Sequence, residues 1–388
     1  MEAFFKVAKR EIYKIKKRPL ILIVLLAVPL ITCFILASTF VAGSPRELPI
    51  AILDQDNTNI TRKISRMVDA TPTCAIKYKV NDLEEGRKLI TGGQIYALIF
   101  IPRNFTRDIK RGTHPQLVYY YNNQMILIGG LITKDVATTV QTAMAGFDVN
   151  IQMKKGLPKD AVLRKVNVIR LDEHIHSNPY LNYCYFLSYA TFAHTFQIII
   201  AFLAIWTIGI EFKEGTTKEW LQEANDSILI GVFGKLFVYI ICFLFLISLT
   251  YYIYIILYGA PFEGNILFLL LGTIAFILSY QLMGIMFVAI TSNLRLSFSC
   301  GAFYTSLGFT FAGMTYPNMA MPLLGRAYSS LLPVRPYVNL VVDQIMRGFQ
   351  PHYDLIYIWW MLGLAIFGSL FLPLLKKHAQ NERQWFKL

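Results

Sequence analysis

The sequence predicts an α-helical polytopic membrane protein with six transmembrane helices and an inserted extracytoplasmic α/β domain. Several apolar segments exceed the roughly 20 residues that a helix needs to cross a bilayer. Strand-like and helix-like segments alternate between the first and second of them, and both chain ends are basic. Of the 388 residues, 55% are hydrophobic and 16% are charged. This composition excludes an intrinsically disordered chain and argues against one ordinary soluble domain.

Six segments have the length and composition of membrane spans. The first, residues 20–42, contains no Asp, Glu, Lys or Arg. It is longer than the apolar core of a secretory signal peptide, so an uncleaved anchor is favoured over a cleaved signal. Pro29 lies in its middle and predicts a kink. The other expected spans are residues 183–210, 229–258, 266–291, 296–315 and 353–375.

Basic residues near the span ends predict the topology. Residues 1–19 and the tail 376–388 are both basic, and an even number of spans places both ends on one side, so both termini are expected in the cytoplasm. Residues 43–182 are then extracytoplasmic. The net charge of +13 is therefore a topology signal. Nucleic-acid binding is not expected, because no stacking platform or base-reading motif accompanies the charge.

Residues 1–19 predict an amphipathic helix in the cytoplasmic interface. At about 100° per residue, the apolar side chains fall on one side and the basic ones lie mainly opposite. Apolar burial and anionic lipid would hold such a helix, and a solvated basic tail is the alternative. The apolar set is Phe4, Phe5, Ala8, Ile12 and Ile15, and the basic set is Lys6, Lys9, Arg10, Lys14, Lys16 and Lys17.

Residues 43–182 predict an α/β domain. The alternation of elements argues for a sheet with parallel neighbours and helices packed on it, and it leaves the strand order open. Expected strands are 48–54, 74–80, 95–102, 115–122 and one near 166–171, and expected helices are 59–70, 81–93, 102–112 and 125–155.

Two local patterns in this domain suggest metal binding. Residues 54–58 (DQDNT) resemble the opening of a calcium loop, but Asn59 and Ser65 stand where Gly and Glu are needed, so helix capping is favoured. His174 and His176 could share one strand face beside two acidic residues, but no further ligand is identifiable. No metal site is therefore predicted.

Catalytic motifs are absent from the sequence. There is no phosphate-binding G-x-x-x-x-G-K-[ST] loop, H-E-x-x-H, G-x-S-x-G or C-x-x-C. Lys235 lies one or two turns into the third span and is expected to snorkel to the cytoplasmic face. Thr191, His194 and Gln197 form a polar stripe on the second span, for which a helix–helix contact is favoured over a translocation path. The energy source is expected to be another chain.

The segment between the second and third spans is the most informative. Residues 209–227, GIEFKEGTTKEWLQEANDS, hold five acidic and two basic residues, which is unusual on a positive-inside surface. Thr216 or Thr217 can cap a short helix that presents Trp220 as an exposed knob for a partner protein. A solvated loop is the alternative.

This segment resembles the E-x-x-x-G-T-x-x-x-L pattern in permeases of type-2 ATP-binding-cassette (ABC) exporters. In that family the loop is a coupling helix that sits in a cleft of the ATPase subunit. Glu211, Gly215 and Thr216 match, and Leu221 lies one residue late. The resemblance implies that residues 211–227 couple to the ATPase through Glu211, Glu214, Gly215, Thr216, Lys218, Trp220 and Leu221.

Two more segments carry the same resemblance, so that it covers nearly the whole chain. Residues 313–348 resemble the proline-rich re-entrant segment that precedes the family's last span. It implies an outer gate within residues 316–350, formed by Pro317, Met321, Pro322, Pro333, Pro336 and Arg347. The outer domain resembles the branch with a large insert after the first span, through Asp54, Asp56, Gly92, Pro102, Phe105 and Gly112.

The resemblance implies the permease subunit of an exporter in the bacterial inner membrane, with spans two to six in residues 183–375. Its cargo would be hydrophobic or amphipathic, as in multidrug or lipid efflux. A cytoplasmic ATPase dimer would bind ATP and Mg, so this chain needs no cofactor. Further implied partners are a second permease copy or a sister permease, a periplasmic adaptor, an outer-membrane channel and membrane lipids. A membrane-anchored sensor and an exporter of a lipid-linked polymer are the alternatives.

Overall fold

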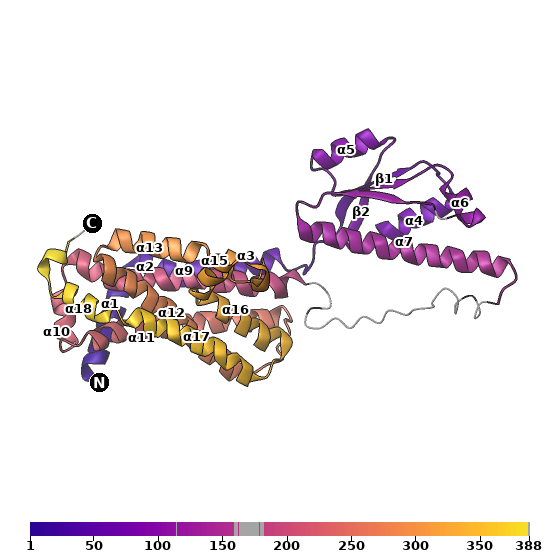
Figure 1. The fold of residues 1–388 in the computed structure, drawn as a ribbon. Coiled ribbons are helices and arrows are strands. Elements are labelled where there is room, and N and C mark those ends of the chain that lie inside the picture. Colours follow the sequence, from indigo (N-terminus) through magenta and orange to yellow (C-terminus); the bar gives the residue numbers. More distant parts are fainter. Residues whose placement is uncertain (114, 159–161, 163–177, 179–181, 387–388) are drawn as a thin grey trace. The chain divides into compact units, whose positions relative to one another are not determined.

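The computed structural model describes residues 1–113, 115–158, 162, 178 and 182–386. The chain forms two compact units (Figure 1). The helical unit contains Met1–Gly43 and Ile175–Leu388, and the α/β unit contains Ser44–His174. The extracytoplasmic position of the α/β unit stays a prediction.

The α/β unit is built on a four-stranded sheet of order β2-β1-β3-β4. Strand β1 is parallel to β2 and β3, and β4 is antiparallel to β3, so the expectation of parallel neighbours is confirmed. The expected strand near 166–171 lies outside the described residues. The strands are β1 (Leu48–Asp54), β2 (Cys74–Lys79), β3 (Ala97–Ile101) and β4 (Val118–Tyr121).

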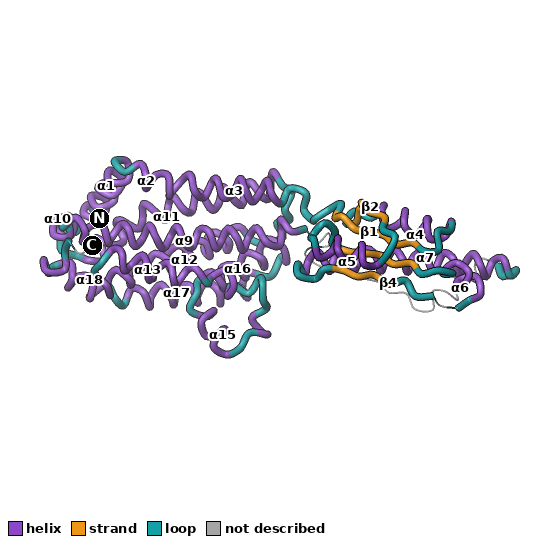
Figure 2. The backbone as a smooth tube through the Cα atoms, turned by 90° about the horizontal axis from the view of Figure 1, so that it is seen from above, coloured by secondary structure: helices purple, strands orange, loops and turns teal. Residues whose placement is uncertain are grey.

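Helices cover both faces of this sheet (Figure 2). Ile64 and Val68 of α4 and Ile132 of α7 share a core with Ile50 and Ile99 of the sheet. A smaller cluster packs α5 on the opposite face. The helices are α4 (Asn59–Asp69), α5 (Leu83–Thr91), α6 (Phe105–Arg111) and α7 (Ile126–Lys154).

Residues 54–58 cap α4, as favoured over calcium binding. The Thr58 side chain accepts from the Thr61 N–H, and Thr61 bonds back to the Thr58 N–H. Asp56 accepts hydrogen bonds from the N–H of Thr106 at 3.0 Å and from the Thr58 hydroxyl at 3.2 Å. Partial burial alone would raise the pKa of Asp56, but these hydrogen bonds outweigh it and lower the pKa.

In the described part of the chain, five helical stretches are long and apolar enough to cross a membrane. Pro29 follows the π-helical turn η1, which accommodates the irregularity that a proline introduces. The stretches are α2–η1–α3 (Pro19–Leu22, Ile23–Ala27, Val28–Thr39), α9 (Tyr183–Glu214), α11–η2 (Ile228–Tyr252, Ile253–Leu257), α12 (Ile266–Thr291) and α17–α18 (Pro351–Ser369, Leu372–Ala379).

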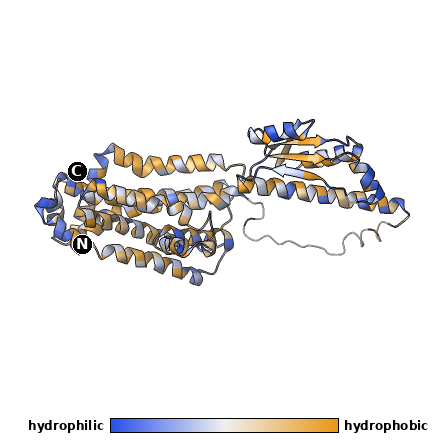
Figure 3. Ribbon diagram, turned by 45° about the horizontal axis from the view of Figure 1, so that its top comes forward, coloured by the Kyte–Doolittle hydropathy of each residue, from blue (hydrophilic) through white to orange (hydrophobic). Residues whose placement is uncertain are grey.

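The expected span 296–315 is divided between two shorter helices. Helix α13 (Leu294–Ser306) has 13 residues, and α14 (Gly308–Phe311) has four. Neither reaches the length of a span alone, so the count of six is not confirmed. Figure 3 shows hydrophobic residues along the long helices of the helical unit and hydrophilic residues at the end that holds the chain termini.

Residues 316–350 form short helices that begin after prolines. Pro317, Pro322 and Pro333 are the N-cap residues of η3 (Asn318–Ala320), α15 (Leu323–Ser330) and α16 (Val334–Val342), and η4 (Asp343–Arg347) follows. Side chains satisfy the interrupted backbone. The carbonyls of Phe311, Ser330 and Leu331 accept hydrogen bonds from Ser329, Trp360 and Tyr304. Non-helical backbone at membrane depth requires such hydrogen-bond partners within the protein.

Helix α1 (Glu2–Lys16), the short α10 (Thr217–Glu223), α18 and η5 (Glu382–Gln384) lie at one end of the helical unit (Figure 1). Val7, Trp220, Val232 and Leu375 belong to one hydrophobic cluster there. Both chain ends are therefore packed around α10.

Candidate functional site

An ion network is buried where α1, α9 and α11 meet. Its members are Arg10, Glu11, Lys14, Glu211 and Lys235, and together they are called the α1–α9–α11 network below. It joins parts of the chain about two hundred residues apart, and it contacts α10 through Arg10 and Lys235.

Glu211 is the centre of this network and has no exposed surface. Its carboxylate accepts from the Nζ of Lys235 at 2.5 Å, from the Nζ of Lys14 at 2.6 Å and from Nη2 of Arg10 at 3.2 Å. The Thr216 hydroxyl also donates to it. A buried carboxylate needs this many charge-assisted partners to offset its lost hydration.

Lys235 does not snorkel to the surface, so that prediction is wrong. It is 1% exposed, and its Nζ donates to the Thr207 carbonyl at 2.9 Å. Besides Glu211, Glu11 Oε2 lies 3.0 Å from the same ammonium. Because two carboxylates and a carbonyl surround Lys235, its charge can remain in the interior.

Glu11 attaches α1 to the bundle. Its Oε1 accepts from the Thr207 hydroxyl at 2.6 Å and from the Tyr239 hydroxyl at 2.8 Å. The sequence contains one signal for this role: Glu11 lies four residues from both Val7 and Ile15, which are buried. A carboxylate on the buried face of a helix requires a partner, and Lys235 is the only lysine in the expected spans.

The E-x-x-x-G-T pattern is the end of α9. Gly215 has φ +68°, a left-handed conformation that favours glycine, and a Cβ there would lie 2.3 Å from the Phe386 ring. The Thr216 N–H donates to the Glu211 carbonyl at 2.9 Å. The spacing therefore places the Thr216 hydroxyl back on the Glu211 carboxylate.

Trp220 is buried, and the expectation of an exposed docking knob is wrong. It has no exposed surface, Leu221 is 3% exposed, and the indole donates to the Gly231 carbonyl at 3.1 Å. The Lys235 ammonium lies 5.5 Å from the indole ring. The apolar face of α10 points inward because it packs against α11 in one hydrophobic cluster. Lys218, Glu219 and Gln222 are the exposed residues of α10.

Basic residues of α1 and of the turn that follows it neutralise much of the acidic loop. Arg10 lies 3.8 Å from Glu219 and 3.6 Å from Glu223, and Arg18 pairs with Glu214. Burial and the Lys235 charge lower the pKa of Lys14, although Glu211 opposes this. The loop is therefore not a free negative patch.

A cleft of about 330 Å³ lies between α10 and the C-terminal segment. Lys218, Gln222 and Asp226 line one side of it, and Gln380 and Trp385 line the other. The exposed face of α10 borders this cleft, so a partner that contacts α10 also meets the tail.

The polar stripe on α9 is a contact between helices. Gln197 has no exposed surface and donates to the Thr305 carbonyl of α13 at 3.1 Å, and Tyr280 of α12 donates to it. His194 Nδ1 lies 2.5 Å from the Gln197 amide nitrogen, while the Thr191 hydroxyl bonds within α9. A helix–helix contact is the interpretation of the stripe that the sequence favoured. A role of the stripe in a translocation path stays a prediction.

The residues of the expected outer gate are divided between surface and interior. Met321 and Pro336 are buried, whereas Pro317 and Pro322 are exposed. Arg347 donates to Asp343 at 2.7 Å across one turn of η4. Pro333 begins α16, and its neighbour Val334 donates from its N–H to the Tyr280 hydroxyl at 3.3 Å. The gate role of these residues stays a prediction.

Within the described residues, no group of three or more His, Cys, Asp or Glu side chains could hold a metal. His174 and His176 lie outside them. All five cysteines are free.

Comparison with known proteins identifies relatives. The sequence model described as "ABC-2 family transporter protein" matches residues 17–375. The linearmycin resistance permease protein LnrN of Bacillus subtilis (strain 168) is 24% identical over 125 residues. That alignment covers 32% of this chain and 32% of the relative, so the chain is matched to about a third of the relative's length.

Proposed function

Since the chain belongs to the ABC-2 family of transporter proteins, we propose that it is the permease subunit of an ABC exporter in the bacterial inner membrane. ATP and Mg would be bound by a separate cytoplasmic ATPase dimer. The observation that carries the proposal is the α1–α9–α11 network, because it ties α1 to the two long apolar helices on either side of α10, and its Arg10 also pairs with Glu219 and Glu223 of α10.

A rigid attachment is what a coupling helix needs. Force applied to α10 passes into α9 through Gly215 and Thr216, and into α11 through Trp220 and Gly231. A short helix moves together with its neighbours when its side chains are packed against them and hydrogen-bonded to them. ATP-driven closure of the ATPase would then tilt α9 and α11 together and bias the permease between inward-facing and outward-facing states.

We propose that α13 and α14 together form the fifth of six passages through the membrane. The joint cluster of α1, α10 and α18 supports this, because an even number of passages returns the chain to its starting side. Both termini and α10 would then be cytoplasmic, and the α/β unit extracytoplasmic, in agreement with the basic ends.

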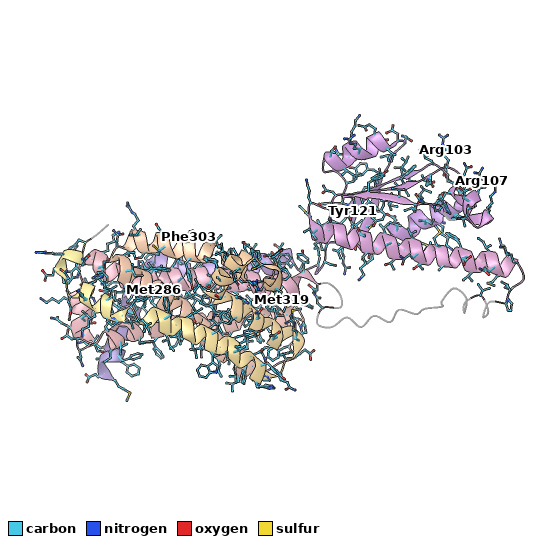
Figure 4. The ribbon with its side chains drawn as sticks, viewed as in Figure 1. Arg103, Arg107, Tyr121, Met286, Phe303 and Met319 are labelled. Carbon is cyan, nitrogen blue, oxygen red and sulfur yellow. The ribbon has the colours of Figure 1, made fainter. Side chains whose placement is uncertain are left out.

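The exposed face of α13–α14 supports pairing with a second permease copy. Ala302, Ser306 and Thr310 are exposed at four-residue spacing, beside the exposed Phe303 labelled in Figure 4. Small residues at this spacing allow close helix packing in membranes. A short, broken helix also gains from cover by a partner chain.

The cargo would be hydrophobic or amphipathic. The helical unit has aromatic and aliphatic walls, and the relative's name associates that protein with resistance to linearmycin. The α/β unit would contact a periplasmic adaptor or an outer-membrane channel. The other candidates, a sensor and an exporter of lipid-linked polymer, have no such supporting observation.

The proposal is tested by co-expressing the chain with the phosphate-loop ATPases of the same genome and measuring co-purification. Lys218→Gln together with Gln222→Lys keeps the net charge and alters only exposed positions of α10 that have no ion pair in the described part of the chain. We expect this variant to lose most of the ATPase while its thermal unfolding stays unchanged. Lys77→Gln together with Gln94→Lys makes the matched exchange at exposed positions of the α/β unit and should leave the complex intact.

Equal recovery of the ATPase with both double variants would overturn the assignment of α10 as the coupling helix. Failure of the unaltered chain to co-purify with any phosphate-loop ATPase would overturn the exporter function itself.

A further inference from the structure

A groove of about 610 Å³ runs between α1, the first long apolar stretch and α11. Phe5, Ala8, Ile12 and Ile15 of α1 form one wall. The opposite walls are Leu22, Leu25, Leu26, Phe237, Val238, Ile241 and Cys242. Its volume lies within the roughly 300–1,000 Å³ typical of ligand pockets.

The walls are apolar and open to the outside of the helical unit. Ile12, Leu26 and Ile241 are 42%, 41% and 52% exposed. Two of these belong to helices long enough to cross a membrane, and α1 precedes the first of them directly. The groove therefore lies where the bilayer meets its surface, and acyl chains are the apolar material available there.

Two lysines stand at the rim. Lys9 and Lys16 line the groove, and a separation of seven residues places them on one side of α1, about 10 Å apart. Arg10 and Lys14 of the same helix are occupied by carboxylates. Lys9 and Lys16 have no carboxylate partner among the residues that the structure describes.

We propose that this groove is a binding site for an anionic phospholipid of the leaflet that α1 contacts. An acyl chain fills the apolar floor, and the headgroup phosphate lies between the ammonium groups of Lys9 and Lys16. The site is separate from α10 and from the face proposed to pair with a second copy, so it does not depend on the export function.

Cys242 in the groove makes the site measurable. Cys33, Cys74 and Cys184 are buried, so Cys300→Ser leaves Cys242 as the accessible thiol for a bimane label. The labelled full chain is placed in phosphatidylcholine nanodiscs containing doxyl-labelled phosphatidylglycerol or doxyl-labelled phosphatidylcholine. We expect the anionic lipid to quench the label at a lower mole fraction than the neutral lipid.

Lys9→Gln together with Lys16→Gln should reduce this preference by roughly fivefold per lysine, the ratio that corresponds to about 1 kcal/mol. Lys6→Gln together with Lys17→Gln removes the same charge from two exposed positions outside the groove, one in α1 and one directly after it, and should keep the preference. Equal quenching by the two lipids would overturn the proposal. So would an equal loss in both double variants, which would mean that only the overall charge of α1 attracts the lipid.

Discussion

The burial of Lys235 makes a sharp prediction about the α1–α9–α11 network. Lys235→Met keeps the length of the side chain and removes the charge that faces Glu11 and Glu211. Glu211 retains Arg10 and Lys14. Glu11 is left without any cation, although it keeps its hydrogen bonds from two hydroxyls.

The expected loss of stability follows from the buried Glu11 carboxylate that is left without a cation. A unit pair 3.0 Å apart attracts by roughly 5 kcal/mol at an effective dielectric constant of about 20, and desolvation offsets part of this. Removal of one partner of a buried pair typically costs about 3–5 kcal/mol, because the other charge stays buried. Glu11→Gln alone should cost less, about 1–2 kcal/mol, since Lys235 keeps Glu211 and the Thr207 carbonyl.

The assay is thermal unfolding of the purified chain in nanodiscs for the wild type, both single variants and the double variant. Glu11→Gln should rescue Lys235→Met, because a neutral amide needs no cation and its oxygen can still accept from Thr207 and Tyr239. We expect a double variant more stable than Lys235→Met by about 1–3 kcal/mol. Simple additivity of the two losses would refute a direct coupling between Glu11 and Lys235.

Three further variants test other parts of the fold by thermal unfolding. Trp220→Ala should lower the free energy of unfolding by about 3–5 kcal/mol, because it leaves a cavity. Gln222→Ala, on the exposed side of α10, should change it little. Equal effects of the two variants would contradict the burial of the indole. Gly215→Ala should cost about 1–2 kcal/mol because of its positive φ, and Gly363→Ala, in an open helical position, should not destabilise the chain. Asp56→Ala should cost about 1 kcal/mol at pH 7. This cost should shrink as the pH falls below the unfolded Asp pKa of about 4, because a carboxylate with a lowered pKa stabilises the fold above its unfolded pKa and loses this effect as the pH falls through the folded pKa. A loss that persists at low pH would contradict that role of the charge.

The α/β unit was predictable because its signals are local. The expected strand 48–54 coincides with β1, and the expected helix 59–70 matches α4 within one residue. Hydrophobic alternation, N-cap residues and glycine stops act over a few residues. The strand order β2-β1-β3-β4 was not predictable, because it depends on pairing between distant segments.

Much of the candidate site was not predictable from local signals in the sequence. The start of a short helix at Thr216 or Thr217 was predicted from a local pattern, and α10 begins at Thr217 with Thr216 as its N-cap residue. The burial of Trp220 and Lys235 depends on α1, α9 and α11 meeting in space. An amphipathic helix has the same sequence pattern whether its apolar face meets a partner or its own bundle. The exposed tryptophan was therefore a reasonable prediction that tertiary packing overturned.

The charges of α1 and of the loop around α10 are two halves of one feature. Arg10, Lys14 and Arg18 turn toward the loop and pair with Glu211, Glu219, Glu223 and Glu214, so the acidity of the loop matches α1 rather than an outside partner. A partner that docks on α10 therefore meets a surface whose charges are largely compensated, and shape and hydrogen bonding must supply its specificity. The lysines that turn away from the loop have no such carboxylates in the described part of the chain. Their charge remains available to an anionic membrane surface, so the basic residues of this segment are divided between the acidic loop and the outside of the helical unit.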